Sequence, residues 1–160
     1  ASKMLRANLS DIASSGASPL YYMLGFSKRN ENFVEEFSQG LKSVQDQFGV
    51  TLIGGDTIKS QKSFFSITVF GVTKKEKTLS RSNAKKGDLI FVSGSIGDAC
   101  LGLKLGDKNI KNPLTSSETD YLRNRHFFPT PRLNLGQELL KQNLSQCAID
   151  VSDGFLADLQ

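Results

Sequence analysis

Three short acidic motifs contain the residues of this chain that are best suited to chemistry. They lie at residues 8–11, 52–57 and 150–154, and each sets a carboxylate beside a hydroxyl at the edge of an expected helix or strand. None of the three contains histidine or cysteine. Oxygen ligands of this kind suit a hard cation such as Mg²⁺, which proteins usually share with phosphate groups. The sequence therefore predicts a magnesium and phosphate site that involves Asp11, Asp56 and Asp150.

The second motif is expected to follow a short buried strand. Residues 50–53 have the apolar character of such a strand. Gly54 and Gly55 would then let the backbone turn and come close to a ligand. This would place Asp56 at the strand tip, where open α/β sheets usually carry their chemistry.

The first motif is expected at the start of a short helix. Residues 4–9 predict the last part of a strand, and Ser10 or Asp11 then caps a helix that ends at Ser15. Asp11 would lie near the positive end of that helix dipole, which also favours an anion or a metal-phosphate group. A capping role alone is the simpler alternative for Asp11.

The third motif is expected between a strand and a helix. Residues 147–151 predict a short strand, in which the period of two puts Asp150 and Ser152 on one side. Asp153 then leads into a helix that begins at Phe155.

The remaining pattern predicts an α/β (α+β) fold in two parts. Residues 20–26 and 64–72 read as strands, and Asn32 is expected to cap a helix between them. That helix carries an apolar stripe of Phe33, Phe37, Leu41, Val44 and Phe48. We expect a mixed sheet with helices on one face in an N-terminal domain at 1–73, a linker at 74–87, and the start of an α/β C-terminal domain at 88–160.

The C-terminal part opens on a weak phosphate-binding pattern. Residues 88–93 predict a strand, 94–97 a glycine turn and 98–105 a helix, an order in which backbone amides can point at a phosphate. The turn matches neither GxGxxG nor GxxxxGK[ST], so a conventional P-loop or dinucleotide fold is not favoured. Further helices are expected from Thr115 or Ser117 to about Arg125, and from Thr130.

The formal charge of +4 comes from one segment. Residues 59–88 hold eight Lys or Arg against two Asp or Glu. A nucleic-acid surface would interleave basic residues with stacking aromatics, so a solvated loop is the favoured reading and nucleic-acid binding the less favoured alternative. No apolar stretch approaches the roughly 20 residues of a membrane span, and Cys100 and Cys147 form no paired motif. We expect no membrane association and a reducing, cytoplasmic location.

The motifs, read in order, carry a family resemblance. They are residues 8–13, 16–17, 52–57, 81–84, 87–88, 92–94, 97–98, 129–132 and 148–154. Each is weak alone, but their joint order is specific. The chain resembles the thiamine-monophosphate kinases, which are members of the superfamily named for aminoimidazole ribonucleotide synthetase.

The resemblance implies a reaction and a set of site residues. It implies ATP-dependent phosphorylation of thiamine monophosphate to thiamine diphosphate, by direct in-line transfer with Mg²⁺ and without a catalytic nucleophile. It implies homodimers that pair through the N-terminal domains. By the same resemblance Mg²⁺ would be held by Asp11, Asp56, Asp150 and Asp153, and ATP would contact Gly55, Asp56, Arg81 and Ser152.

The family's substrate-binding segments have no counterpart in these 160 residues. We therefore expect a piece of a longer protein that is inactive alone. Two alternatives remain beside the kinase and the nucleic-acid binder: another ATP-using synthetase of the superfamily, acting on selenophosphate or aminoimidazole ribonucleotide chemistry, or a nucleotide-binding module without turnover.

Overall fold

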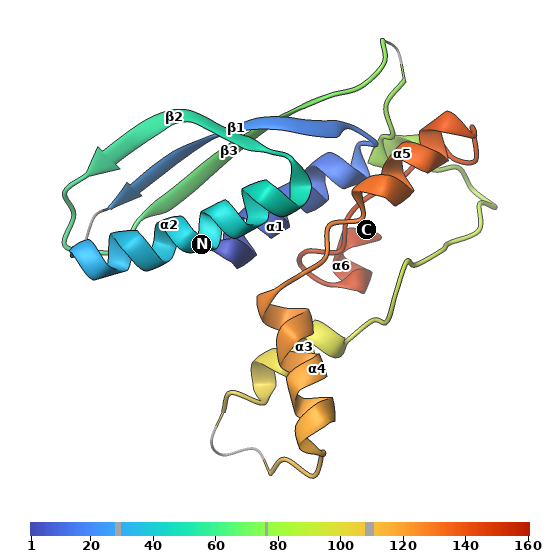
Figure 1. The fold of residues 1–160 in the computed structure, drawn as a ribbon. Coiled ribbons are helices and arrows are strands. Elements are labelled where there is room, and N and C mark those ends of the chain that lie inside the picture. The colour runs from blue at the N-terminus through green and yellow to red at the C-terminus, as the bar shows by residue number, and fades with distance from the viewer. Residues whose placement is uncertain (28–29, 76, 108–110) are drawn as a thin grey trace.

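The strands that the structure describes all lie in the first half of the chain. The computed structural model describes residues 1–27, 30–75, 77–107 and 111–160. In chain order the elements are α1 (Ser2–Ser14), β1 (Ser18–Ser27), α2 (Glu31–Phe48), β2 (Thr51–Ile58), β3 (Phe65–Val72), the 3₁₀ helix η1 (Arg81–Asn83), α3 (Asp98–Lys104), α4 (Ser116–Phe127), α5 (Leu133–Lys141) and α6 (Phe155–Asp158) (Figure 1). The predicted α/β class is confirmed. None of the helices in the described ranges has the length and apolar character that crossing a membrane requires.

β1 is the central strand of a three-stranded mixed sheet in the order β2-β1-β3. It runs parallel to β2, with Gly25 opposite Asp56, and antiparallel to β3, with Tyr21 opposite Phe70. Helices α1 and α2 lie together along one face of this sheet (Figure 1). The predicted mixed sheet with helices on one face is therefore confirmed.

The core of the first half lies between this sheet and the two helices. Leu5 and Leu9, one helical turn apart in α1, are fully buried, as are Tyr22 in β1 and Val44 in α2. Because side chains of a strand alternate between faces, Tyr22 points into the core and the adjacent Tyr21 does not. The face of the sheet away from the helices therefore keeps large apolar side chains exposed, among them Tyr21, Met23, Phe70 and Val72.

The predicted strand at residues 4–9 is wrong, because this segment belongs to α1. Its apolar residues recur every four positions at Leu5, Leu9 and Ala13, all of them buried, which is the helical period. Ser10 and Asp11 are consequently not caps. Asp11 lies in the last turn of α1, where its backbone carbonyl accepts a hydrogen bond from Ser15 N at 3.2 Å.

The cap of α2 is Asn30 rather than the predicted Asn32. The Asn30 side chain accepts a hydrogen bond from Phe33 N at 2.8 Å, so the helix begins two residues earlier than expected. The predicted apolar stripe is confirmed: Phe37, Leu41 and Val44 are buried, and Phe33 and Phe48 pack against them.

The predicted turn at Gly54 and Gly55 is wrong, because β2 continues through both glycines to Ile58. The register between β1 and β2 shifts near Tyr22, so that one residue of β2 has no partner in β1 at this point, as in a β-bulge. Gly55 has a φ of +144°, and a Cβ on it would lie 1.8 Å from the carbonyl oxygen of Leu24. Close approach of the neighbouring strand, rather than a turn, therefore requires glycine here.

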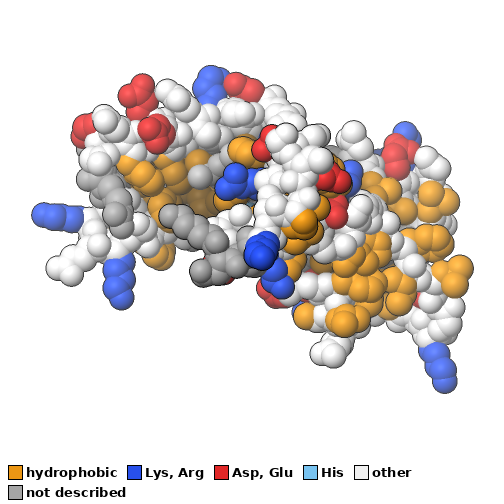
Figure 2. Space-filling view, turned by 90° about the horizontal axis from the view of Figure 1, so that it is seen from below, with side chains coloured by type: hydrophobic (Ala, Val, Ile, Leu, Met, Phe, Trp, Pro, Cys, Tyr) orange, Lys and Arg blue, Asp and Glu red, His pale blue; other side chains and the backbone are white. Residues whose placement is uncertain are grey.

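The predicted strands at 88–93 and 147–151 are also wrong, since the structure has no strand in its described residues after Val72. A strand needs a partner for its backbone hydrogen bonds, and no described segment pairs with either stretch. Leu89 and Phe91 in the first of these stretches are 81% and 86% exposed. Hydrophobic side chains cover broad areas of the surface seen from below (Figure 2).

The helices of the second half follow the predictions more closely. α3 matches the expected helix from Asp98, and α4 begins after Thr115 as expected, with a reciprocal capping box between Thr115 and Glu118. α5 begins at Leu133, three residues after the predicted Thr130. It packs on α1 at close range, because a Cβ on Gly136 would lie 2.0 Å from the carbonyl oxygen of Ala13.

Candidate functional site

A polar hollow of about 390 Å³ gathers most of the predicted site residues. Its lining includes Asp11 from the end of α1, Arg81 from η1, and Asp150, Ser152 and Asp153 from the segment before α6. These residues come from three stretches that are far apart in the sequence. The remaining lining residues are Ser14, Ser15, Leu79, Ser80, Ala148, Ile149 and Asp158.

Backbone hydrogen bonds hold the three stretches together. Leu79 N donates to Ser15 O at 3.0 Å, which ties the segment before η1 to the end of α1. Ser80 N donates to Gln146 O, and Asn83 Nδ2 donates to the same oxygen, each at 3.0 Å. The segment around η1 therefore bridges α1 to the stretch that carries Asp150.

Asp158 shapes the loop on the opposite side of the hollow. Its Oδ2 accepts hydrogen bonds from the amides of Ser152 at 2.9 Å, Asp153 at 3.3 Å and Gly154 at 3.2 Å. Sequence reasoning missed this residue. The signal was available, since a carboxylate four residues after Gly154 on a short helix can turn back to satisfy free amides of the preceding loop.

Asp150 is surrounded by other carboxylates in the hollow. Burial raises the pKa of Asp150 above its ordinary value, and the neighbouring Asp11, Asp158 and Asp153 raise it further by repulsion. A carboxylate in this position favours either a proton or a cation. The site thus has the electrostatic character of a cation site.

The arrangement fits Mg²⁺ that is shared with a phosphate group, and it does not form an all-protein cage. Among the residues that the structure describes, no three His, Cys, Asp or Glu side chains stand close enough to enclose a metal ion. Mg²⁺ is usually held by one or two carboxylates while phosphate and water complete its shell. Asp11 and Asp150 would supply such a pair, and the Arg81 guanidinium in the same lining would suit phosphate oxygens.

Gly55 and Asp56 lie elsewhere. Both are in β2, and the exposed Asp56 accepts a hydrogen bond from its neighbour Thr57 N at 2.8 Å. The end of α1, which carries Asp11, leads into β1 at Ser18. Asp56 lies instead opposite Gly25 of β1, and about 23 Å of extended strand separates Ser18 from Gly25. The structure therefore brings Asp11, Asp150 and Asp153 together without Asp56.

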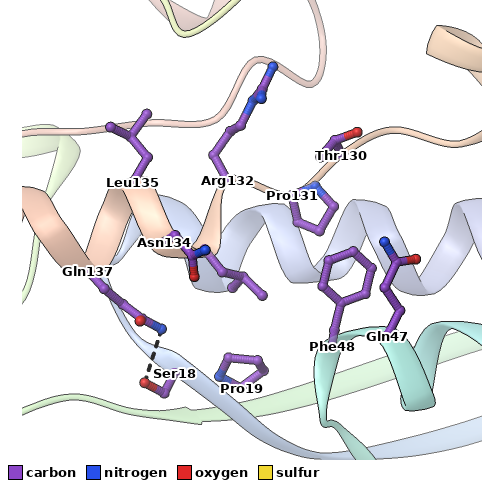
Figure 3. A pocket seen from close by; sticks show the side chains of 11 residues that line it. Ser18, Pro19, Gln47, Phe48, Thr130, Pro131, Arg132, Asn134, Leu135 and Gln137 are labelled. Atoms are coloured by element: carbon purple, nitrogen blue, oxygen red, sulfur yellow. Dashed lines mark hydrogen bonds between the residues drawn. The ribbon is translucent and has the colours of Figure 1, made fainter.

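A second hollow, of about 690 Å³, lies between the C-terminal end of α2, the start of β1 and the start of α5 (Figure 3). Phe48, Pro19 and Pro131 provide apolar walls, and Gln137 Nε2 donates to Ser18 Oγ at 3.1 Å. The side chain of Arg132 extends away from Pro19 and Phe48 (Figure 3). No residue of the predicted site lines this hollow.

Comparison with known proteins relates this chain to one group of kinases. Residues 1–73 match the family model described as AIR synthase related protein, N-terminal domain. Across 98% of its length the chain is homologous to the thiamine-monophosphate kinases. The thiamine-monophosphate kinase of Haemophilus influenzae is 42% identical, and the match covers 47% of that protein.

Solved structures agree with this relationship. The thiamine-monophosphate kinase of Stenotrophomonas maltophilia K279a superimposes with a TM-score of 0.86 at 39% identity, over 99% of this chain and 51% of that chain. A structure of AaThiL complexed with AMPPCP and TMP superimposes with a TM-score of 0.80 at 31% identity, over 96% of this chain and 49% of that chain. The chain spans about half the length of the curated relatives it matches.

Proposed function

We propose that the protein containing this chain phosphorylates thiamine monophosphate to thiamine diphosphate, with ATP as the phosphate donor and Mg²⁺ as the required cation. The observation that carries the proposal is the hollow in which Asp11, Asp150 and Arg81 meet. The homology to thiamine-monophosphate kinases supports the choice of substrate, as does the relative complexed with AMPPCP, an ATP analogue, and TMP. That homology also favours this reaction over the synthetases of the same superfamily.

The proposed mechanism assigns alignment and charge neutralisation to the residues of the hollow. Asp11 and Asp150 would hold Mg²⁺, with Asp153 at the edge of the site as a further ligand. The Arg81 guanidinium would bind phosphate oxygens in a forked arrangement, and the Ser152 hydroxyl would orient one of them. Bound Mg²⁺ would neutralise the phosphate oxygens and hold donor and acceptor in line. No side chain needs to act as a nucleophile in a direct transfer.

Gly55 and Asp56 keep their proposed role as ATP and Mg²⁺ contacts through the family resemblance. Their position on β2 means that this role requires an approach from outside the hollow. Exposure of Asp56 leaves its carboxylate available for such a contact. Asp56→Asn would therefore test the assignment separately from the residues of the hollow.

We further propose that the protein is a homodimer in the cytoplasm. The open face of the sheet supports the dimer, because Tyr21, Met23, Phe70 and Val72 leave apolar surface exposed that a second copy would cover. The free thiols of Cys100 and Cys147 suit a reducing compartment.

The proposal is tested by measuring ADP release by the intact protein. We expect ADP only when ATP, thiamine monophosphate and Mg²⁺ are all present, and we expect Asp150→Asn to abolish the release. A matched control is Asp46→Asn, a change to an exposed carboxylate on α2, which should leave the rate unchanged. ADP release that is independent of thiamine monophosphate would point to another superfamily reaction, and no release would overturn the proposal. Binding of Mg²⁺-ATP without any turnover would favour the nucleotide-binding module instead.

A further inference from the structure

Two arginines converge on the glycine turn at residues 94–97, outside the aspartate hollow. Arg125 comes from the last turn of α4, and Arg132 is the N-cap residue of α5. A Cβ on Gly94 would lie 3.2 Å from Nη2 of Arg132 and 3.6 Å from Nη2 of Arg125. The two Nη2 atoms are therefore at most about 7 Å apart, a distance at which the two guanidinium charges repel each other.

Glycine at position 94 keeps the space between the two arginines open. Its φ is +148°, a conformation that residues with side chains rarely adopt. Any side chain there would also contact both guanidinium groups. The backbone therefore approaches the arginines without filling the gap that they flank.

The protein groups nearby leave this positive charge incompletely compensated. Asp98 Oδ2 lies 3.8 Å from Nε of Arg125, and the same oxygen accepts a hydrogen bond from the Tyr121 hydroxyl at 2.9 Å. Within the described ranges no carboxylate forms an ion pair with Arg132. One acidic group thus faces two arginines.

A hydrogen-bond donor in the same place also lacks an acceptor. Nε of Arg125 is buried and has no hydrogen-bond partner among the described residues. A buried donor without an acceptor costs free energy, so this unpartnered Nε, which belongs to one of the two guanidinium groups, favours an acceptor-rich anion here. The amides of Ser95, Ile96 and Gly97 donate none of the hydrogen bonds found in the described part of the chain, so they remain available too.

We propose that Arg125, Arg132 and the turn at 94–97 form a binding site for a phosphate group. A phosphate dianion balances the two arginines, accepts forked hydrogen bonds from a guanidinium, and has oxygens left for the amides of the turn. This site shares no residue with the aspartate hollow and goes beyond the proposed kinase reaction. If that reaction is correct, the group bound here belongs either to the nucleotide or to the phosphate ester that accepts the transfer.

The site is tested by titrating inorganic phosphate and then pyrophosphate into the intact protein without Mg²⁺, with calorimetry as the readout. We expect saturable binding that Arg132→Ala weakens by about tenfold or more, because one forked charge-assisted contact is lost. Arg132→Lys should recover part of the affinity, since it keeps the charge and loses the fork. Arg123→Ala removes an exposed arginine of α4 and should bind as the unaltered protein does.

The controls separate this proposal from the kinase proposal. Circular dichroism and thermal unfolding of the Arg132 variants should match the unaltered protein, because Arg132 is exposed. Gly94→Ala provides a second variant and should also weaken phosphate binding. Equal affinities in the unaltered protein, Arg132→Ala and Gly94→Ala would overturn the site, as would the absence of saturable binding. Asp150→Asn should keep phosphate binding even if it abolishes ADP release.

Titrations with ATP and with thiamine monophosphate, again without Mg²⁺, identify the source of the phosphate. The ligand whose affinity falls in Arg132→Ala is the one that reaches this turn. A fall for either ligand supports the site, and unchanged affinity for both, together with unchanged phosphate binding, overturns it.

Discussion

Gly136→Ala tests how closely α5 must pack on α1 for the aspartate hollow to keep its shape. The substituted Cβ would lie 2.0 Å from the carbonyl oxygen of Ala13 and 3.3 Å from the Cα of Gly16. Both of these are backbone atoms, so no side-chain rotation relieves the overlap. Since carbon and oxygen atoms in contact need more than 3 Å, α5 must withdraw from α1 by about 1 Å.

Two effects oppose each other in this variant. Replacing glycine by alanine inside a helix stabilises it by about 1 kcal/mol. Overpacking against rigid neighbours costs about 3 kcal/mol here, the upper part of the usual range, because the obstacle is backbone. The net loss is about 2 kcal/mol, which for a domain of about 150–250 residues lowers Tm by about 4–8 °C.

The same displacement should reach the site. Ala13 shares the last turn of α1 with Asp11, and the chain leaving α5 leads to Asp150. A shift of about 1 Å between the helices changes the spacing of the two carboxylates, and a misplacement of that size can lower activity by up to about a hundredfold. We therefore expect Gly136→Ala to lose ADP release at temperatures where it is still folded.

Gly40→Ala is the matched control, because Gly40 is also a helical glycine. Its Cβ would meet only the Cβ of Ala1 at 3.0 Å and Ser2 N at 3.7 Å, contacts that a shift of a few tenths of an ångström relieves. We expect Gly40→Ala to raise or preserve Tm in differential scanning fluorimetry. If Gly136→Ala raised Tm as well, the packing argument for α1 and α5 would be refuted.

Three further predictions concern the hollow, the sheet and α4. The pKa of Asp150 is raised in the folded state, so its ionisation costs stability as the pH rises above the ordinary range of aspartate. Without Mg²⁺, Asp150→Asn should therefore have a higher Tm than the unaltered protein at pH 7, and this difference should disappear in acid. Mg²⁺ should raise the Tm of the unaltered protein but not that of Asp150→Asn in fluorimetry, and an equal Mg²⁺ response of the two proteins would contradict this. Phe70→Glu puts a charge on the open sheet face and should convert a dimer to monomers in light scattering, whereas Gln39→Glu on the exposed side of α2 should not. Thr115→Ala removes the capping box of α4 and should lower Tm by about 2–4 °C; the pKa of Glu118, now lowered by its hydrogen bonds from Thr115, should rise in an NMR titration.

Local sequence patterns correctly predicted the helices and strands whose hydrophobic period agrees with the way they pack in the fold. The stripe from Phe33 to Phe48 has the helical period, and it packs on a sheet as that period requires. β3 was predicted from its alternation, and α4 from Thr115 or Ser117 as a starting residue. In these cases short-range preference and tertiary packing favour the same structure.

Predictions failed where a distant partner decides the structure. Residues 88–93 have a strand composition, but β propensity acts only when another strand is alongside. Gly54 and Gly55 resemble a turn, yet the parallel neighbour β1 keeps them in an extended strand. Residues 4–9 are too short a window to separate a buried strand from a buried helix, and only the continuation to Ala13 reveals the helical spacing.

The candidate site shows the same division between residue identity and placement. Asp11 and Asp150 were predicted from their types and motifs and Arg81 through the family resemblance, and all three line the hollow. What joins them is a set of backbone hydrogen bonds from Leu79 and Ser80, which no side-chain pattern announces. Asp56 belongs to an equally clear motif, but it lies near the C-terminal end of β2, at the far end of the sheet. A motif therefore predicts which groups bind magnesium and phosphate, whereas the bridge around η1 determines which of these groups lie together.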